Sequence, residues 1–127
     1  MTELQRILHV DDDLDIQYIV KISLETIGGF TIEQCSSGKD ALERAPTFQP
    51  QLVLLDLMMP EMDGEETYQE LRKLDGFSEI PVIFVTAKAH DQFVKELKAK
   101  GARDVITKPF DPMKLPDQIR AIWIASC

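Results

Sequence analysis

The chain has 127 residues, 44% of them hydrophobic, and a formal net charge of −8 at pH 7. This length predicts one domain over residues 1–127 that can bury a core without disulfides or structural metals. The acidic balance argues against direct binding of nucleic acid, because clustered Lys and Arg hold phosphate backbones. No signal-peptide pattern is present and no apolar stretch approaches the ~20 residues of a membrane span. We therefore expect a cytoplasmic protein outside the membrane.

Short apolar runs alternate with segments of helical periodicity along the chain. The runs predict strands at 7–10, 30–35, 52–55, 81–85 and 105–106. The first intervening helix is expected to end at Gly28-Gly29, and the second to run from Ser37-Gly38 to a stop at Pro46. A third spans about 64–74, with Tyr68 and Leu71 inward, and a fourth ends before Gly101.

The last helix has two alternative starts. Leu115, Ile119 and Trp123 share one face of it. Asp111-Pro112 has the pattern of an N-cap followed by proline at the first helical position. Pro116 conflicts with that start, because a proline deeper than the first turn removes a helix hydrogen bond. Either the helix begins near Leu115 or its first turn is distorted.

Five strands that alternate with five helices predict an α/β fold with a parallel sheet covered on both faces. Ligands of such sheets bind beyond the carboxyl ends of the strands. Asp11, Asp56, Thr86 and Lys108 all fall at or just past such ends. We therefore expect these four residues to form one site.

Asp56 is the most informative residue of that site. It ends the apolar run Leu52-Val53-Leu54-Leu55, which reads as a buried strand. A carboxylate there is costly to hold ionised unless a cation or hydrogen-bond donors meet it. The arrangement suits a carboxylate that accepts a phosphoryl group, with Thr86 donating a hydrogen bond to one phosphoryl oxygen and Lys108 pairing with another.

Three carboxylates around one point also predict a metal ion. Asp11, Asp12 and Asp56 would raise each other's pKa and loosen the fold if nothing offset their charge. Mg²⁺ is the preferred candidate, since it is bound by one to three carboxylates together with waters and phosphate oxygens. Together, Mg²⁺ and the positive charge of Lys108 would leave the three-carboxylate site near neutral.

Four motifs in order resemble the receiver domain of two-component response regulators. They are Val10-Asp11-Asp12-Asp13, the stretch from Asp56 to Gly64, Val85-Thr86-Ala87 and Lys108-Pro109-Phe110. The resemblance covers essentially the whole chain. It implies a doubly wound five-stranded (βα)5 fold of the flavodoxin-like or CheY-like type, with strand order 2-1-3-4-5, and a cis peptide between Lys108 and Pro109.

The resemblance also implies the role of each site residue. Asp56 is the phosphoacceptor, Asp12 is a direct Mg²⁺ ligand and Asp11 reaches the metal largely through water. The backbone carbonyl of Met58 completes the protein ligands. The domain is then a signalling switch rather than a turnover enzyme, phosphorylated by a sensor histidine kinase or a histidine phosphotransfer domain, and phosphorylation can drive homodimerisation.

Three positions depart from the family pattern or tune it. Val105 stands where many receivers have Tyr or Phe, so the aromatic half of the usual Thr-aromatic switch is absent or altered. Phosphorylation should then be read mainly through the loop after Thr86, from about Lys88 onward. Met58 and Lys88 occupy positions that influence the lifetime of the acyl phosphate in the family, and residue identity alone does not yield that lifetime.

Two rival functions match part of the sequence pattern. The triplet Asp11-x-Asp13-x-Asp15 superficially matches the start of haloacid-dehalogenase-like phosphatases, but that interpretation leaves Asp56 unexplained and needs a longer chain. The second rival is a receiver-like docking module that is never phosphorylated, against which the complete set of reactive residues argues. Asp13 alone is more readily a helix N-cap, and His9 and His90 are expected to be a core and a surface residue.

The output is expected to pass through another protein, because no DNA-binding or catalytic segment follows Trp123. The chain is either a stand-alone regulator or a receiver from a larger protein. The kinase, the stimulus and the target are not encoded in any motif. Cys35 and Cys127 have no metal-ligand spacing, and we expect a core residue and a tail thiol rather than a disulfide.

Overall fold

The computed structural model describes residues 3–88 and 90–125 and contains one five-stranded parallel sheet. The strands are β1 (Arg6–Val10), β2 (Thr31–Cys35), β3 (Leu52–Asp56), β4 (Val82–Thr86) and β5 (Asp104–Thr107). Their order in the sheet is β2-β1-β3-β4-β5, so the doubly wound topology predicted from the sequence is confirmed. In β3 and β4 every residue is buried, as expected for strands covered on both faces.

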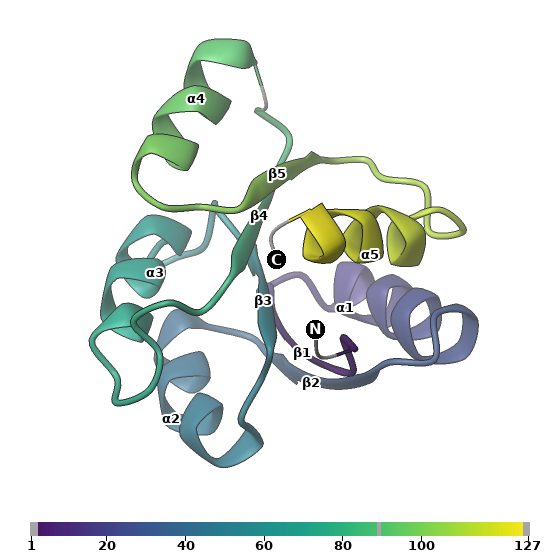
Figure 1. The fold of residues 1–127 in the computed structure, drawn as a ribbon, viewed down its shortest axis with the longest axis horizontal. Coiled ribbons are helices and arrows are strands. Elements are labelled where there is room, and N and C mark those ends of the chain that lie inside the picture. Colours follow the sequence, from purple (N-terminus) through teal and green to yellow (C-terminus); the bar gives the residue numbers. More distant parts are fainter. Residues whose placement is uncertain (1–2, 89, 126–127) are drawn as a thin grey trace.

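Helices cover both faces of the sheet. They are α1 (Leu14–Lys21), continued by the π-helix η1 (Ile22–Ile27), then α2 (Gly38–Phe48), α3 (Gly64–Arg72), α4 (Asp91–Ala99) and α5 (Leu115–Ala125). Figure 1 shows α2, α3 and α4 on one side of the sheet and α1 and α5 on the other. Each side has its own apolar core: Tyr68 and Leu71 of α3 are buried in the first, and Leu115 and Ile119 of α5 in the second.

The predicted stop of the second helix at Pro46 is wrong. The helix α2 continues through Pro46 to Phe48 and ends at Gln49, which takes a left-handed conformation with φ 58° and donates its N–H to the Ala45 carbonyl at 2.9 Å. Ala45 is fully buried and Phe48 packs against the core. This packing holds the last turn although the proline lacks one hydrogen bond, because tertiary contacts supply most helical stability.

The first helix ends where expected but is not uniform. Gly29 has φ +74° and forms the predicted left-handed stop. From Ile22 onward the backbone hydrogen bonds change to the wider π pattern. Ser23, in this wider segment, is buried and donates its hydroxyl to the Pro112 carbonyl at 2.6 Å. Helical periodicity carries no signal for this change.

Of the two starts considered for the last helix, the one near Leu115 is confirmed. Asp111 precedes it in a turn, in which its carboxylate accepts the N–H of Met113 at 2.9 Å and its carbonyl accepts the N–H of Leu115 at 3.0 Å. Pro116 therefore lies in the first turn, where a helical N–H has no partner to lose. The peptide between Lys108 and Pro109 is cis, as the resemblance implied.

Cys35 is a free, buried thiol, whereas Cys127 lies outside the described residues. Burial raises the pKa of Cys35 to about 12, so this thiol is an inert core residue. No described helix is long and apolar enough to cross a membrane.

Candidate functional site

The carboxyl ends of four strands meet at one edge of the sheet. Asp11 directly follows β1, Asp56 ends β3, Thr86 ends β4 and Lys108 follows β5. The structure brings these four side chains together around an open cavity of about 250 Å³. The lining residues are Asp11, Asp12, Asp13, Asp56, Met58, Thr86, Ala87 and Lys108. Strand order explains the meeting, because β1, β3, β4 and β5 are successive neighbours in the sheet.

Lys108 joins the two buried carboxylates. Its Nζ lies 3.1 Å from Asp11 Oδ2 and 3.1 Å from Asp56 Oδ1. Burial by itself lowers the pKa of this lysine, but the hydrogen bond to Asp56 and the charge of Asp11 outweigh that effect and raise it. Lys108 therefore carries its positive charge at neutral pH.

Asp11 and Asp56 are only 1% and 5% exposed. Burial raises the pKa of both carboxyls, and the charge of Asp11 raises that of Asp56 further, although Lys108 opposes both effects. A carboxyl whose pKa is higher in the folded than in the unfolded state costs stability once the pH exceeds the unfolded value. The ionised site is therefore destabilising, and it favours any added positive charge.

The same carboxylates form a cluster that fits a metal ion. Asp11, Asp12 and Asp56 each offer an oxygen, and these oxygens all lie within 4.8 Å of one another. Asp12 is exposed whereas the other two are buried, so one ligand faces solvent. A set of oxygen donors open on one side matches a hard divalent cation that retains waters.

Thr86 connects the site to the loop that leads into α4. It is 2% exposed, and its Oγ1 accepts the backbone N–H of Lys88 at 3.1 Å. The Thr86 carbonyl accepts the N–H of Lys108 at 2.9 Å. Movement of the Thr86 hydroxyl toward the cavity would therefore release the Lys88 N–H, while the side chain of Lys88 is exposed.

Two further predicted positions lie around the site. Met58 is 66% exposed on the rim of the cavity. Val105 lies in β5, where it is half-buried against the core on the α3 and α4 side of the sheet, and it does not line the cavity. The structure thus separates Val105 from the residues around Asp56.

Sequence reasoning missed two residues that position the site. Gly64 begins α3 so close to the end of β3 that an added Cβ would collide with the Asp56 carbonyl and the Leu57 Cα. Gln17, half-buried on α1, donates its amide to the Asp11 carbonyl at 2.7 Å and to Ser36 Oγ at 3.0 Å. Gly64 could have been recognised from the sequence, because it directly follows Asp63, the N-cap of α3. No sequence pattern marks Gln17.

Three residues given structural roles in the sequence analysis take those roles. Asp13 caps α1 by accepting the N–H of Asp15 at 2.9 Å. His9 is buried in β1, where its Nδ1 lies 3.1 Å from the Gln34 amide nitrogen. The exposed His90 is the N-cap of α4.

The response regulator receiver domain model matches residues 7–120. The chain belongs to this family. Among curated relatives it is 38% identical to the DNA-binding dual master transcriptional regulator RpaA of Synechocystis sp., over 92% of this chain and 48% of that protein. It is 36% identical to the alkaline phosphatase synthesis transcriptional regulatory protein PhoP of Bacillus subtilis, over 93% of this chain and 48% of that one. The receiver domain thus spans about half the length of these relatives.

Solved structures agree on the fold. The chemotaxis protein CheY4 of Vibrio cholerae is 27% identical and superposes with a TM-score of 0.86, covering 94% of this chain and 99% of that one. CheY from Borrelia burgdorferi, in complex with CheX, BeF3 and Mg²⁺, is 26% identical with a TM-score of 0.84, covering 94% and 89%. The protein is therefore a receiver domain of two-component signalling, a class of switch that works through phosphorylation.

Proposed function

We propose that Asp56 is the residue of this single receiver domain, residues 1–127, that accepts the phosphoryl group. The observation that carries the proposal is its environment: a carboxylate at the end of a buried strand, open to the cavity, with Lys108 Nζ 3.1 Å from one oxygen. In the transfer, an Asp56 oxygen bonds to phosphorus as the phosphorus–nitrogen bond of a phosphohistidine breaks. The histidine nitrogen keeps that electron pair.

Mg²⁺ is the proposed metal, held by Asp11, Asp12, Asp56 and the Met58 carbonyl. The support is the cluster formed by the three carboxylates and the Mg²⁺ present in the related Borrelia CheY complex. When bound, the ion supplies positive charge to a site whose ionised carboxylates destabilise the fold. Lys108 and Thr86 then hold phosphoryl oxygens, Lys108 as a charge and Thr86 as a hydroxyl donor.

The phosphodonor is proposed to be a sensor histidine kinase or a histidine phosphotransfer domain. An apolar surface beside the cavity supports a protein donor: Leu14 and Tyr18, one turn apart on α1, are 69% and 68% exposed, and Met113 is 67% exposed. A hollow of about 260 Å³ adjoins the Asp56 cavity, with which it shares Ala87 and Lys108. Its other lining residues are Ile16, Ile19, Pro109, Phe110 and Pro112. Exposed apolar side chains grouped around a polar site mark protein interfaces.

The output of this domain is proposed to be a protein contact, controlled through Thr86, Lys88 and α4. The DNA binding named for RpaA belongs to that longer protein. We expect Lys108→Ala to accept phosphate still, because Asp56 and the metal remain. It should fail to bind its target, because one of the two residues that sense the phosphoryl group is missing. If phosphorylated Lys108→Ala bound the target as tightly as phosphorylated wild type, Lys108 would not couple phosphorylation to target binding.

A phosphorylation assay separates this function from its alternatives. Wild type, Asp56→Asn and Asp11→Asn are incubated with a phosphorylated histidine phosphotransfer domain and Mg²⁺, and the labelled residue is mapped by mass spectrometry. We expect hydroxylamine-sensitive labelling at Asp56 in wild type and none in Asp56→Asn. Steady phosphate release that depends on Asp11 as nucleophile would indicate a phosphatase, and an unlabelled wild type would indicate a docking module.

A further inference from the structure

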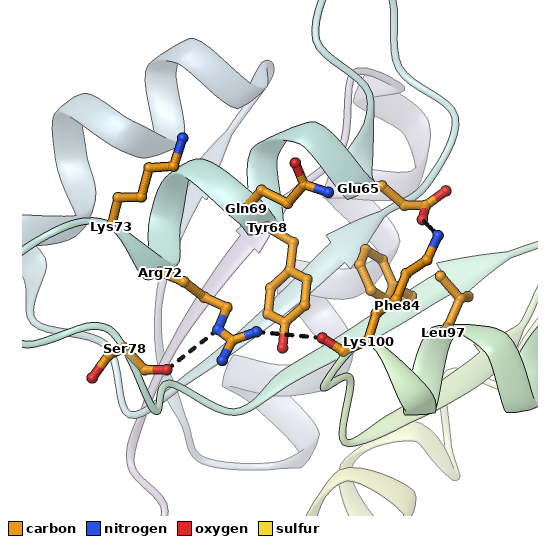
Figure 2. Close-up of a pocket in the computed structure, with 9 residues that line it drawn as sticks. All are labelled: Glu65, Tyr68, Gln69, Arg72, Lys73, Ser78, Phe84, Leu97 and Lys100. Atoms are coloured by element: carbon orange, nitrogen blue, oxygen red, sulfur yellow. Dashed lines mark hydrogen bonds and ion pairs between the residues drawn. The ribbon is translucent and has the colours of Figure 1, made fainter.

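A groove between α3 and α4 lies outside the phosphoacceptor site. Its volume is about 510 Å³, within the range of small-molecule pockets. Its lining residues are Glu65, Tyr68, Gln69, Arg72, Lys73, Ser78, Phe84, Leu97 and Lys100. Figure 2 shows the side chains of α3 along one wall and those of α4 along the other, with Phe84 of β4 behind them.

The charges of the groove are unevenly compensated. Lys100 pairs with Glu65 at 2.6 Å, and Lys73 pairs with Glu70 at 2.7 Å. Arg72 has no carboxylate partner within the described ranges 3–88 and 90–125. Its guanidinium donates only to two backbone carbonyls, those of Ser78 and Lys100, both at 3.3 Å. Among the described residues that line the groove, the positive charge of Arg72 therefore has no counter-charge, in a chain of net charge −8.

Tyr68 places an unused hydroxyl beside that charge. The residue is only 5% exposed, with its ring edge-on to Phe84 and the Arg72 guanidinium 5.4 Å from the ring centre. Within the described part of the chain its hydroxyl makes no hydrogen bond. Every fully buried polar side-chain atom there has a hydrogen-bond partner, so this hydroxyl is not fully buried. The hydroxyl must therefore open into the groove, beside the Arg72 fork (Figure 2).

Gly101 keeps the space in front of these two donors clear. A Cβ on this residue would collide with the Tyr68 hydroxyl and lie 3.2 Å from Arg72 Nη1. Gly101 also has φ +115°, a conformation that other residues rarely adopt. The glycine thus leaves a small cradle where a guanidinium and a phenol hydroxyl converge.

We propose that this groove binds a small organic oxyanion, a carboxylate on a compact apolar body. The oxyanion would accept hydrogen bonds from the Tyr68 hydroxyl and the Arg72 guanidinium, and the apolar body would lie toward Phe84 and Leu97. A guanidinium binds planar carboxylates well because its donors form a fixed fork. The ligand would contact α3 and α4 together, and its binding does not require phosphorylation of Asp56.

The test is an NMR titration of the full, unphosphorylated chain without Mg²⁺, so that its outcome does not depend on the phosphoacceptor chemistry. The probe is benzoate, and the benzylammonium ion serves as a control of the same shape and opposite charge. We expect saturable shifts of the Gly101 amide and the Arg72 Nε signal with benzoate. Equal shifts with benzylammonium, or no saturation, would overturn the proposal.

Two variants locate the binding. Tyr68→Phe removes only the hydroxyl and should weaken benzoate binding about tenfold, as expected for a hydrogen bond to a charged group. Tyr18→Phe removes the hydroxyl of an exposed tyrosine on α1 and should leave the affinity unchanged. Arg72→Gln should abolish saturable binding, and circular dichroism checks that each variant folds. Unchanged affinity in both Tyr68→Phe and Arg72→Gln, or equal binding of inorganic phosphate, would refute the assigned ligand class.

Discussion

The last two helices of the receiver domain are held very differently. Three residues of α5 are buried: Leu115, Pro116 and Ile119. Leu97 is the one residue of α4 that is buried, and Figure 1 shows α4 standing out from the rest of the molecule. An element with few buried contacts can move at small free-energy cost. We therefore expect a change at Asp56 to be read on α4 while α5 stays in place.

The polar contacts reinforce this difference. Around α5, Ser23 binds the Pro112 carbonyl at 2.6 Å, and Arg120 binds the Gly28 carbonyl with its guanidinium 4.4 Å from the centre of the Phe30 ring. At the start of α4, His90 caps the Phe93 N–H at a long 3.4 Å. The end of α4 is held more firmly, by Lys100 on Glu65. Movement of α4 should therefore be largest at its N-terminal turn.

The largest expected effect tests the core contacts of the two helices. Leu115→Ala in α5 should lower the free energy of unfolding by about 2–5 kcal/mol, because a fully buried leucine leaves a cavity. Val94→Ala, at a half-buried position of α4, should cost about 1 kcal/mol or less. Urea unfolding followed by circular dichroism measures both. Similar losses in the two variants would contradict the contrast.

The second prediction compares the buried His9 of β1 with the exposed His90 at the start of α4. Burial, and then Lys108, lowers the pKa of His9 to about 3. The Gln34 amide nitrogen also donates to the Gln17 carbonyl at 2.7 Å, which fixes its orientation and leaves His9 Nδ1 as an acceptor. The folded state thus binds fewer protons than the unfolded state below pH 6.5. Stability should fall by about 2 kcal/mol between pH 8 and pH 5 from this residue alone.

Replacement by asparagine isolates that effect, because its side-chain oxygen can still accept the Gln34 hydrogen bond. The pH dependence of unfolding in His9→Asn should lose this fall, whereas His90→Gln, in the exposed cap of α4, should keep it. Denaturant midpoints at pH 5 and pH 8 provide the comparison. A wild-type slope retained in His9→Asn would show that other groups cause the acid sensitivity.

The third prediction concerns metal binding between β1 and β3. Saturating Mg²⁺ should raise the free energy of unfolding by roughly 1–3 kcal/mol through binding to the folded state alone. Asp12→Ala should be more stable than wild type without metal, since one of three repelling carboxylates is gone, and should respond less to the ion. Thermal melts with and without Mg²⁺ decide this. A wild type indifferent to millimolar Mg²⁺ would rule the site out.

The smallest effect is expected in the response to a phosphoryl mimic. With beryllofluoride and Mg²⁺, amide exchange should change from Lys88 into the first turn of α4 and stay constant in α5. Thr86→Ala should reduce that change several-fold, because it removes the hydroxyl that binds the Lys88 N–H. Val105→Ala should alter it little, because valine has one stiff torsion and no large area to move. Changes confined to β5, with α4 silent, would be incompatible with this switch.

The sequence alone determined the sheet and the residues at its functional edge. Strand β3 is an unbroken apolar run that ends in Asp56, and parallel strands place all their carboxyl ends on one side. That rule predicts that Asp11, Thr86 and Lys108 lie beside Asp56. The rule applies here because a buried apolar strand can be recognised from its own residues. The chemical roles proposed for these residues are tested by the assays above.

Other features were decided only by tertiary packing. Pro46 is read locally as a helix stop, yet the contacts of Ala45 and Phe48 with the core carry α2 past it. The π-helix at Ser23 accompanies a hydrogen bond to Pro112, 89 residues away in the chain. The groove at Tyr68 and Arg72 lies where the chain at the end of α4, Lys100 and Gly101, meets α3. Such contacts join residues distant in sequence, so no local pattern can encode them.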